Sequence, residues 1–145
     1  MGRRGATRVT AQDIARAGGI QGFVKLLVKK MQSGDSGEQE VASTSMKNLA
    51  EQSHGEHADL LFSSGAVSPL VKLLNSGTAV AQAACASALH YIGQRKAAHQ
   101  TAIVEAGAIK PLVKLLKSGG SKVQEAVRML FTKMFCNCNL ASLSP

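Results

Sequence analysis

The residues best able to do chemistry are histidines and cysteines, and they do not gather into a catalytic or metal-binding motif. His54 and His57 bound the run HGEH, and Cys136 and Cys138 form a C-x-C pair near the C-terminus. Structural zinc sites combine two such ligand pairs at a defined spacing, and neither run has a second pair nearby. The sequence therefore predicts no metal and no cofactor, a polar turn at HGEH, and free thiols in the C-x-C pair.

The other candidate nucleophiles and bases are isolated in the sequence. Cys85 lies in the run QAACASAL, where close helix packing needs small residues, so we expect a buried and unreactive thiol. His90 and His99 stand alone, and we expect them at the surface or at helix caps. The sequence contains no G-x-S-x-G, P-loop or H-E-x-x-H motif. It predicts a protein that is not an enzyme.

Positive charge is concentrated at the two ends of the chain, which has a formal net charge of +8. Residues 1–9 hold three arginines and no acidic residue, residues 10–95 hold seven basic and seven acidic residues, and residues 96–145 hold seven basic and two acidic residues. Binding of nucleic acid or an anionic membrane is therefore an alternative function for the C-terminal third. Its candidate residues are Lys110, Lys114, Lys117, Lys122, Arg128 and Lys133, without interleaved aromatic residues for base stacking.

Compartment signals are few. An odd set of three cysteines does not suit a disulfide framework and fits a reducing compartment. The N-terminal MGRRGATRVT is basic but is not followed by the apolar segment of a secretory signal. No apolar run approaches the ~18–20 residues of a transmembrane helix. We expect a cytoplasmic protein, a nuclear protein, or one present in both compartments.

One ten-residue segment occurs in three similar copies, and these copies determine the fold prediction. GGIQGFVKLL begins at Gly18, GAVSPLVKLL at Gly65 and GAIKPLVKLL at Gly107. The second copy begins 47 residues after the first, and the third begins 42 residues after the second. A repeat of about 42 residues indicates an array of stacked structural units, because each unit buries its apolar face against its neighbours.

Each copy marks the junction between two helices. An apolar residue stands four positions before each glycine and belongs to a short predicted helix: Ile14, Leu61 and Ile103. Glycine readily adopts the left-handed conformation that closes a helix. Pro69 and Pro111 then suit the first turn of the next helix, where a missing N–H loses no hydrogen bond, and the first copy has Gly22 there.

A third and longer helix is predicted after a polar turn in each copy, over residues 38–53, 79–94 and 121–135. These helices share an apolar residue in register, which we expect in the core: Met46, Leu89 and Leu130. The second helices share a lysine, which we expect to face water: Lys25, Lys72 and Lys114. Apolar spacing of three and four residues supports helices rather than strands.

This unit of short helix, glycine, medium helix, turn and long helix resembles the armadillo repeat, whose most recognisable segment is GAIxPLVxLL. Vacuolar anchoring proteins are among the long members of that family. The resemblance implies an all-α fold, a right-handed superhelical solenoid of three repeats at about 10–54, 55–95 and 96–135, each of three helices. Residues 1–9 would form a basic flexible N-terminus and residues 136–145 a C-terminal tail.

The resemblance also implies a site. Third helices of armadillo proteins line a concave groove, which in many members binds an extended peptide through an Asn and a Trp four residues earlier. The Asn positions here are Asn48, Tyr91 and Thr132, and the Trp positions are Thr44, Ser87 and Arg128. Only Asn48 matches, and Arg128 would repel cationic peptides, so a receptor for basic nuclear-localisation peptides is not expected. We expect these six residues either to bind a neutral-to-acidic protein segment, with Tyr91 as the principal contact, or to form a plain solvated concave face.

The apolar C-terminal end leaves further alternatives open. Its last predicted helix contains five large apolar residues, more than one neighbour can cover: Met129, Leu130, Phe131, Met134 and Phe135. A terminal repeat needs a polar outer face. The sequence therefore predicts that the tail folds back over this helix, that the chain self-associates there, or that it is a fragment of a longer array.

Overall fold

The structure is a computed structural model that describes residues 11–16, 18–52, 57–94, 96–118, 120–121 and 123–132. These residues form helices and turns, and none of them belongs to a β-strand. No helix in this part of the chain is both long enough and apolar enough to cross a bilayer. His54, the C-x-C pair, the N-terminal segment 1–9 and the tail 136–145 lie outside the described residues, so what was predicted for them stays a prediction.

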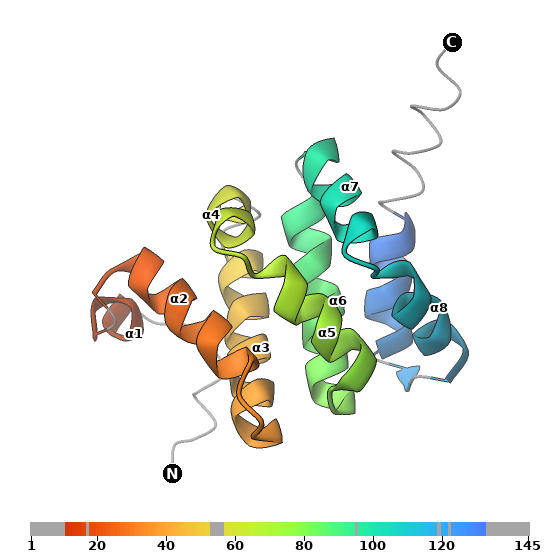
Figure 1. Cartoon of the computed structure of the whole chain (residues 1–145), viewed down its shortest axis with the longest axis horizontal. Helices are drawn as coiled ribbons and strands as arrows, with labels where there is room; N and C mark the ends of the chain where they lie inside the picture. The colour runs from red at the N-terminus through yellow and green to blue at the C-terminus, as the bar shows by residue number, and fades with distance from the viewer. Residues whose placement is uncertain are drawn as a thin grey trace.

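Each repeat consists of a short, a medium and a long helix, as predicted. The first repeat contains α1 (Ala11–Arg16), α2 (Ile20–Met31) and α3 (Ser36–Gln52). The second contains α4 (Ala58–Ser63), α5 (Val67–Ser76) and α6 (Ala79–Gly93), and the third contains α7 (Ala97–Glu105), α8 (Ile109–Ser118) and a last helix at 123–132. Figure 1 shows the repeats side by side in chain order. The predicted all-α solenoid of three repeats is confirmed.

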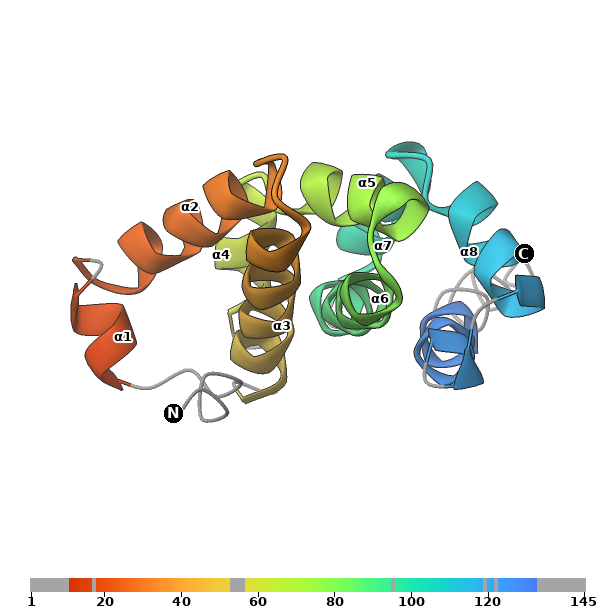
Figure 2. The same ribbon diagram turned by 90° about the horizontal axis from the view of Figure 1, so that it is seen from below.

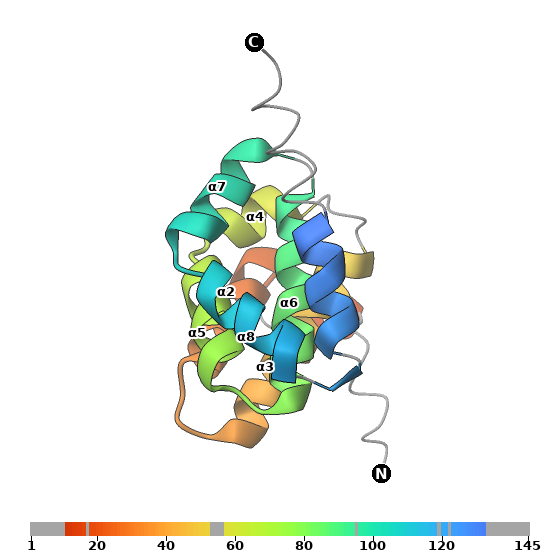
Figure 3. The same ribbon diagram turned by 90° about the vertical axis from the view of Figure 1, so that its right-hand side faces the viewer.

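The row of repeats is curved. Figure 2 shows α2, α5 and α8 along the outer side of the curve and α3, α6 and the 123–132 helix along its inner side. Seen along the row, α5 and α8 again lie on the side opposite α6 and the 123–132 helix (Figure 3). The third helices therefore occupy the position in which the resemblance placed a groove.

The recurring glycine closes the first helix of every repeat in the same way. Gly18, Gly65 and Gly107 have φ angles of +86°, +83° and +90°, a region that strains a residue with a Cβ atom. Each glycine amide donates to the carbonyl three residues earlier, and the next amide donates to the carbonyl five residues before it. These paired bonds are the Schellman motif, and they turn the chain directly into the second helix.

One apolar core runs through all three repeats. The predicted core residues Met46, Leu89 and Leu130 are at most 1% exposed, and the recurring lysines of α2, α5 and α8 are exposed. Cys85 is fully buried among α6 neighbours, and burial raises the pKa of its thiol well above the usual range. The predicted burial of Cys85 is confirmed, and burial disfavours the thiolate, which is the reactive species of cysteine.

A glutamine in register near the start of each third helix bonds to the backbone that precedes it, at the end of the second helix in the second and third repeats and in the turn in the first. Each side-chain amide donates to a backbone carbonyl: Gln39 to Ser33, Gln82 to Leu74 at 3.1 Å, and Gln124 to Leu116 at 3.0 Å. Carbonyls at a helix C-terminus have no partner within their own helix. Gln82 and Gln124 supply that partner and connect consecutive helices, whereas Gln39 connects α3 to the turn after α2.

His99 links the second repeat to the third, and the prediction of a surface position for it is wrong. Its side chain on α7 is 4% exposed. Nδ1 lies 3.0 Å from the carbonyl oxygen of Ile92 at the end of α6, so Nδ1 donates and the ring caps that helix. The ring also stacks on Phe62 with centroids 4.3 Å apart, and Nε2 lies 3.3 Å from Oδ1 of Asp59. The helix-capping role that the sequence also predicted is therefore present, but inside the repeat junction.

Candidate functional site

The six predicted groove residues all lie where solvent reaches the third helices. Thr44 and Asn48 on α3, and Ser87 and Tyr91 on α6, are half-buried. Arg128 and Thr132, on the last helix, are exposed. Within each helix the pair is four residues apart, which places its members one turn from each other on the same face. The structure therefore presents the three pairs as three short rows rather than burying them.

A cleft of about 640 Å³ lies between α3, α6 and the last helix, and we call it the inner cleft. Thr44 and Ser87 line it, and the other four predicted residues do not. Most of its lining is apolar and was not predicted: Val80, Ala83, Ala84, Val123, Ala126 and Met129. The structure thus moves the centre of the candidate site from the Asn positions toward the beginning of α6 and of the last helix.

Two large apolar side chains of the inner cleft are left open to water. Val80 is 55% exposed and Met129 is 45% exposed. A large apolar group at the surface of a cleft is a feature of binding sites, because its burial by a ligand is favourable. The signal was present in the sequence, since Val80 lies outside the core register of α6 that Cys85 and Leu89 define.

Among the residues that the structure describes, the polar lining of the inner cleft has one charge of each sign. Lys47 on α3 and Glu125 on the last helix bring one charge of each sign, and Ser121 adds a hydroxyl. None of these three was predicted. Opposite charges at the two sides of an apolar floor favour a ligand with little net charge, whose backbone amides can pair with the polar groups.

Tyr91 lies on α6, one helical turn beyond the inner cleft. Its ring is half-buried against the core and meets the His90 ring edge-on at 5.0 Å. Partial burial raises the pKa of the Tyr91 phenol, and the Glu51 carboxylate on α3 raises it further. The predicted contact residue is therefore partly packed against the core and partly open to solvent.

Tyr91 is the only tyrosine of the chain, so a spectrophotometric titration of tyrosinate reports it directly. We expect its pKa in the folded protein to exceed that of the urea-unfolded chain, because burial and Glu51 disfavour the phenolate. Since the folded pKa is the higher one, folding stability falls as pH rises from the unfolded pKa through the folded pKa. Glu51→Gln should lower the Tyr91 pKa partway, and Glu125→Gln should leave it in place. Equal values in folded and unfolded chains would contradict this account.

The basic residues proposed for polyanion binding lie on two different helices. Lys110, Lys114 and Lys117 are on α8 in the outer layer, and Arg128 is on the last helix in the inner layer. Lys122 and Lys133 are not among the residues whose side chains the structure describes. The four described cations therefore do not come from one helix face.

The apolar residues of the last helix are largely covered in the part that the structure describes. Leu130 is 1% exposed and Phe131 is 7% exposed, while Met129 remains open and lines the inner cleft. Met134 and Phe135 lie outside the described residues. The predicted core position of Leu130 is confirmed, and Phe131 belongs to the same core. The three alternatives for the apolar C-terminal end stay predictions.

Within the described residues, no group of three or more His, Cys, Asp or Glu side chains could hold a metal ion. His99 and Asp59 do meet, but the described geometry gives them the stacking and capping partners of a repeat junction. The inner cleft is lined instead by apolar groups, hydroxyls and two opposite charges. Its chemistry is that of a recognition surface.

The family of the chain follows from comparison with known repeats. A model of the Armadillo/beta-catenin-like repeat matches residues 56–93 and 97–127, which cover the second repeat and most of the third. The chain is built of armadillo repeats. The first armadillo repeat lies outside these matches, yet it has the same order of helices and the same glycine closure as the other two.

Solved structures share the fold of this armadillo chain. An engineered protein is 31% identical, with a TM-score of 0.71 over 83% of this chain and 52% of its own. A designed armadillo repeat protein is 26% identical, with a TM-score of 0.71 over 78% of this chain and 47% of its own. Another designed armadillo repeat protein, in complex with peptide (KR)4, is 22% identical with a TM-score of 0.69, covering 90% of this chain and 61% of its own.

This armadillo chain spans about half the length of the first two of those structures. No protein of curated function matches the sequence. The likeness to the third structure is a likeness of fold, because the sequences differ at most positions. What this armadillo chain binds must therefore be argued from its own side chains.

Proposed function

We propose that this armadillo chain is a non-catalytic interaction module that binds an extended segment of a partner protein along its inner side. The inner cleft is the observation that carries the proposal. It joins exposed apolar side chains to hydroxyls and charges contributed by all three repeats. Binding sites in proteins commonly combine an apolar surface, which supplies affinity, with a few polar groups, which orient the ligand.

The partner segment should insert an apolar side chain between Val80 and Met129. These two side chains belong to neighbouring third helices and are the exposed large apolar groups among the described residues of the cleft. The backbone on either side would pair with Thr44, Ser87 and the two charged residues of the rim. Because the charges of Lys47 and Glu125 offset each other, we propose a segment that is close to neutral. The exposed Arg128 favours a slightly acidic segment over a slightly basic one.

The same segment would continue past the cleft to Asn48 and Tyr91. These residues lie four positions beyond Thr44 and Ser87, which is about 6 Å along a helix. Asn48 has both a donor and an acceptor for a peptide group, and Tyr91 offers the exposed part of a ring that the core already holds. An extended chain that crosses α3 and α6 near Asn48 and Tyr91 would contact the amide group of the first and the ring of the second.

Peptide binding by this fold has a precedent in a designed relative. The designed armadillo repeat protein with 22% identity was solved in complex with peptide (KR)4. That peptide is strongly basic, whereas the inner cleft of this chain has one described charge of each sign, Lys47 and Glu125. The precedent supports the mode of binding, and the side chains present here support a different peptide.

The proposal is tested with peptides selected on the whole chain from a random library displayed on phage. Selected peptides are synthesised, and their affinity is measured by fluorescence anisotropy for the wild type and for the double variant Val80→Ser/Met129→Ser. We expect affinity to fall by about tenfold or more, because anchor side chains in an apolar cleft dominate binding. The selected peptides should carry an apolar residue and little net charge.

The matched control is Val104→Ser, which changes another exposed valine, 39% exposed on α7, outside the cleft. Its affinity should equal that of the wild type. A second double variant, Asn48→Ala/Tyr91→Ala, tests the continuation of the path beyond the cleft. Peptides that bind all variants equally would overturn the proposed site, and a selected set rich in lysine and arginine would overturn the proposed charge.

A further inference from the structure

The charged side chains of the second helices are all positive, and none of them lines the inner cleft. α2, α5 and α8 contain no aspartate and no glutamate, and all of their charged residues are lysines. We call these the outer lysines: Lys25, Lys29 and Lys30 on α2, Lys72 on α5, and Lys110, Lys114 and Lys117 on α8. The third helices carry described charges of both signs, Glu51 and Glu125 as well as Lys47 and Arg128, so positive charge without any carboxylate is a feature of the second helices.

The outer lysines are available to a partner. Only Lys30 is half-buried, and the other six are exposed. Among the described residues, the ion pairs join Asp59 to Lys96 and to His99, and no outer lysine takes part in one. Ammonium groups without a nearby carboxylate keep their full attraction for an external anion.

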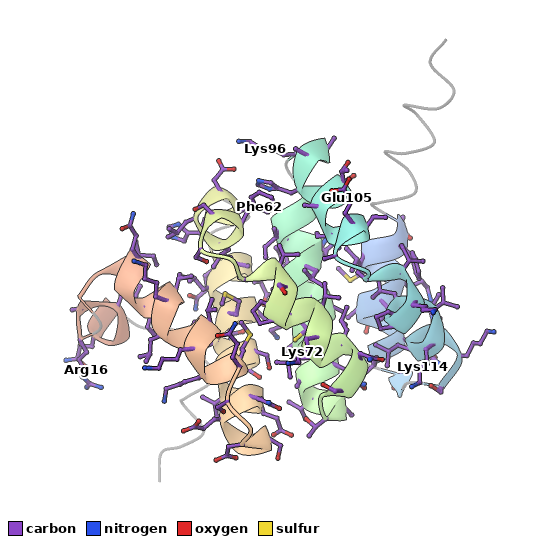
Figure 4. All side chains as sticks on the ribbon, in the orientation of Figure 1. Arg16, Phe62, Lys72, Lys96, Glu105 and Lys114 are labelled. Carbon is purple, nitrogen blue, oxygen red and sulfur yellow. The ribbon has the colours of Figure 1, made fainter. Side chains whose placement is uncertain are left out.

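The outer lysines form two groups with a single lysine between them. Lys110, Lys114 and Lys117 recur at the spacing of one helix face on α8, and α2 carries the other three. Figure 4 shows Lys72 on α5 and Lys114 on α8, the helices that Figure 2 places on the outer side of the curve. A ligand must therefore cross α5 to reach both groups.

Each group has an exposed apolar neighbour. Leu26, next to Lys25, is 42% exposed, and Val113, next to Lys114, is 40% exposed. The α5 residues at the same repeat positions are buried: Leu73, which aligns with Leu26, is 3% exposed, and Val71, which aligns with Val113, is 7% exposed. The lysine groups thus combine charge with a small apolar contact, and the middle of the row does not.

The curvature of the row decides which anion fits. A flat bilayer would touch the outward-bowed face at its middle, where α5 offers one lysine. A single-stranded nucleic acid gains much of its affinity by stacking on aromatic rings, and the exposed residues of α2, α5 and α8 include no aromatic side chain. A flexible polypeptide can follow the curve, and its carboxylates form charge-assisted hydrogen bonds with ammonium groups.

We propose that the outer lysines bind an unstructured acidic polypeptide segment whose carboxylates fall into two groups, each with an apolar residue nearby. This surface is separate from the inner cleft, so the two partners could be bound together. The probe is fluorescently labelled poly-L-glutamate, and its affinity is measured by anisotropy at several salt concentrations. Binding should weaken as salt rises, because the contacts are between exposed charges.

The outer variant replaces five lysines by glutamine: Lys25, Lys29, Lys110, Lys114 and Lys117. The control variant replaces five cations elsewhere in the sequence by glutamine: Arg3, Arg4, Arg8, Arg16 and Lys133. Each variant lowers the formal net charge from +8 by five, so both end at the same value. We expect poly-L-glutamate affinity to fall by about tenfold or more in the outer variant and by less than about threefold in the control.

Equal losses in the two variants would show an effect of net charge alone and would overturn the proposal. So would tighter binding, at the same salt, to phosphatidylserine vesicles or to polyuridylic acid than to poly-L-glutamate. Amide chemical shifts of the wild type provide a readout that needs no variant. Shifts on α2 and α8 when poly-L-glutamate is added support the proposal, and shifts confined to the third helices contradict it.

Discussion

Replacing Leu89 by alanine should lower the free energy of unfolding by about 2–5 kcal/mol, the usual cost of removing a buried leucine side chain. Leu89 is fully buried in the middle of α6. That helix packs on α3, α4, α5 and α7, so it touches all three repeats. A cavity at this position therefore weakens the helix at the centre of the array, and a loss of this size is a large part of the stability of a small domain.

Urea denaturation followed by helical circular dichroism measures this loss. Val80→Ala on the same helix is the matched control, because Val80 is 55% exposed and its truncation opens no cavity. Its effect should stay within about 0.5 kcal/mol. Equal midpoints for Leu89→Ala and the wild type would show that α6 is not the centre of the core.

The second large effect is expected for His99→Ala, which should cost about 1–3 kcal/mol. The substitution leaves the Ile92 carbonyl at the end of α6 without its donor and removes the ring that stacks on Phe62. Both contacts connect the second repeat to the third. A buried acceptor that loses its hydrogen bond carries most of the cost, because water does not reach it in the folded chain.

Lys96→Ala provides the control for the electrostatic part of the same junction. Lys96 pairs with Asp59 at 2.9 Å, but both side chains are more than half exposed, so the pair should contribute about 0–1 kcal/mol. Thermal unfolding of the two variants separates the roles. If His99→Ala were no more harmful than Lys96→Ala, the capping bond and the stack would not hold the repeats together.

The scaffold could be predicted from the sequence because the same structural requirements recur in each repeat. A glycine that must adopt positive φ, an apolar residue that must be buried and a lysine that must face water occur three times in register. Agreement among copies removes the ambiguity of a single short apolar run. The helix bounds follow closely, and the chain begins each second helix two residues after the glycine that closes the first.

The candidate site was predicted only in part, because it depends on how neighbouring helices meet. Thr44 and Ser87 were found through the resemblance, and they line the inner cleft. Val80 and Met129 belong to no motif shared by the repeats. They line the same cleft because of the tertiary packing of two helices, which the sequence does not reveal. His99 was misplaced for the same reason, since its partners Ile92 and Phe62 come from other helices.

Charge was also misread when it was counted along the chain. Residues 10–95 have no net charge, yet the lysines of α2 and α5 lie in the outer layer while carboxylates such as Glu51 lie in the inner one. Every repeat sends its second helix to one side and its third helix to the other. A linear sum cancels charges that the fold separates in space.

The glutamine bonds that fix the start of each third helix have a practical consequence for engineering. The turn before α3 contains four residues, 32–35, and the turn before α6 contains two, 77–78. The Gln82 bond joins α6 to the last turn of α5, whereas the Gln39 bond ends on Ser33 inside the 32–35 turn itself. The longer turn is therefore part of the contact that positions α3, and an insert after Ser33 should weaken that contact. The shorter turn holds Thr78, which caps α6 and donates to Glu40 of the preceding repeat. An epitope or reporter fragment should therefore be placed outside both turns, although their lengths differ.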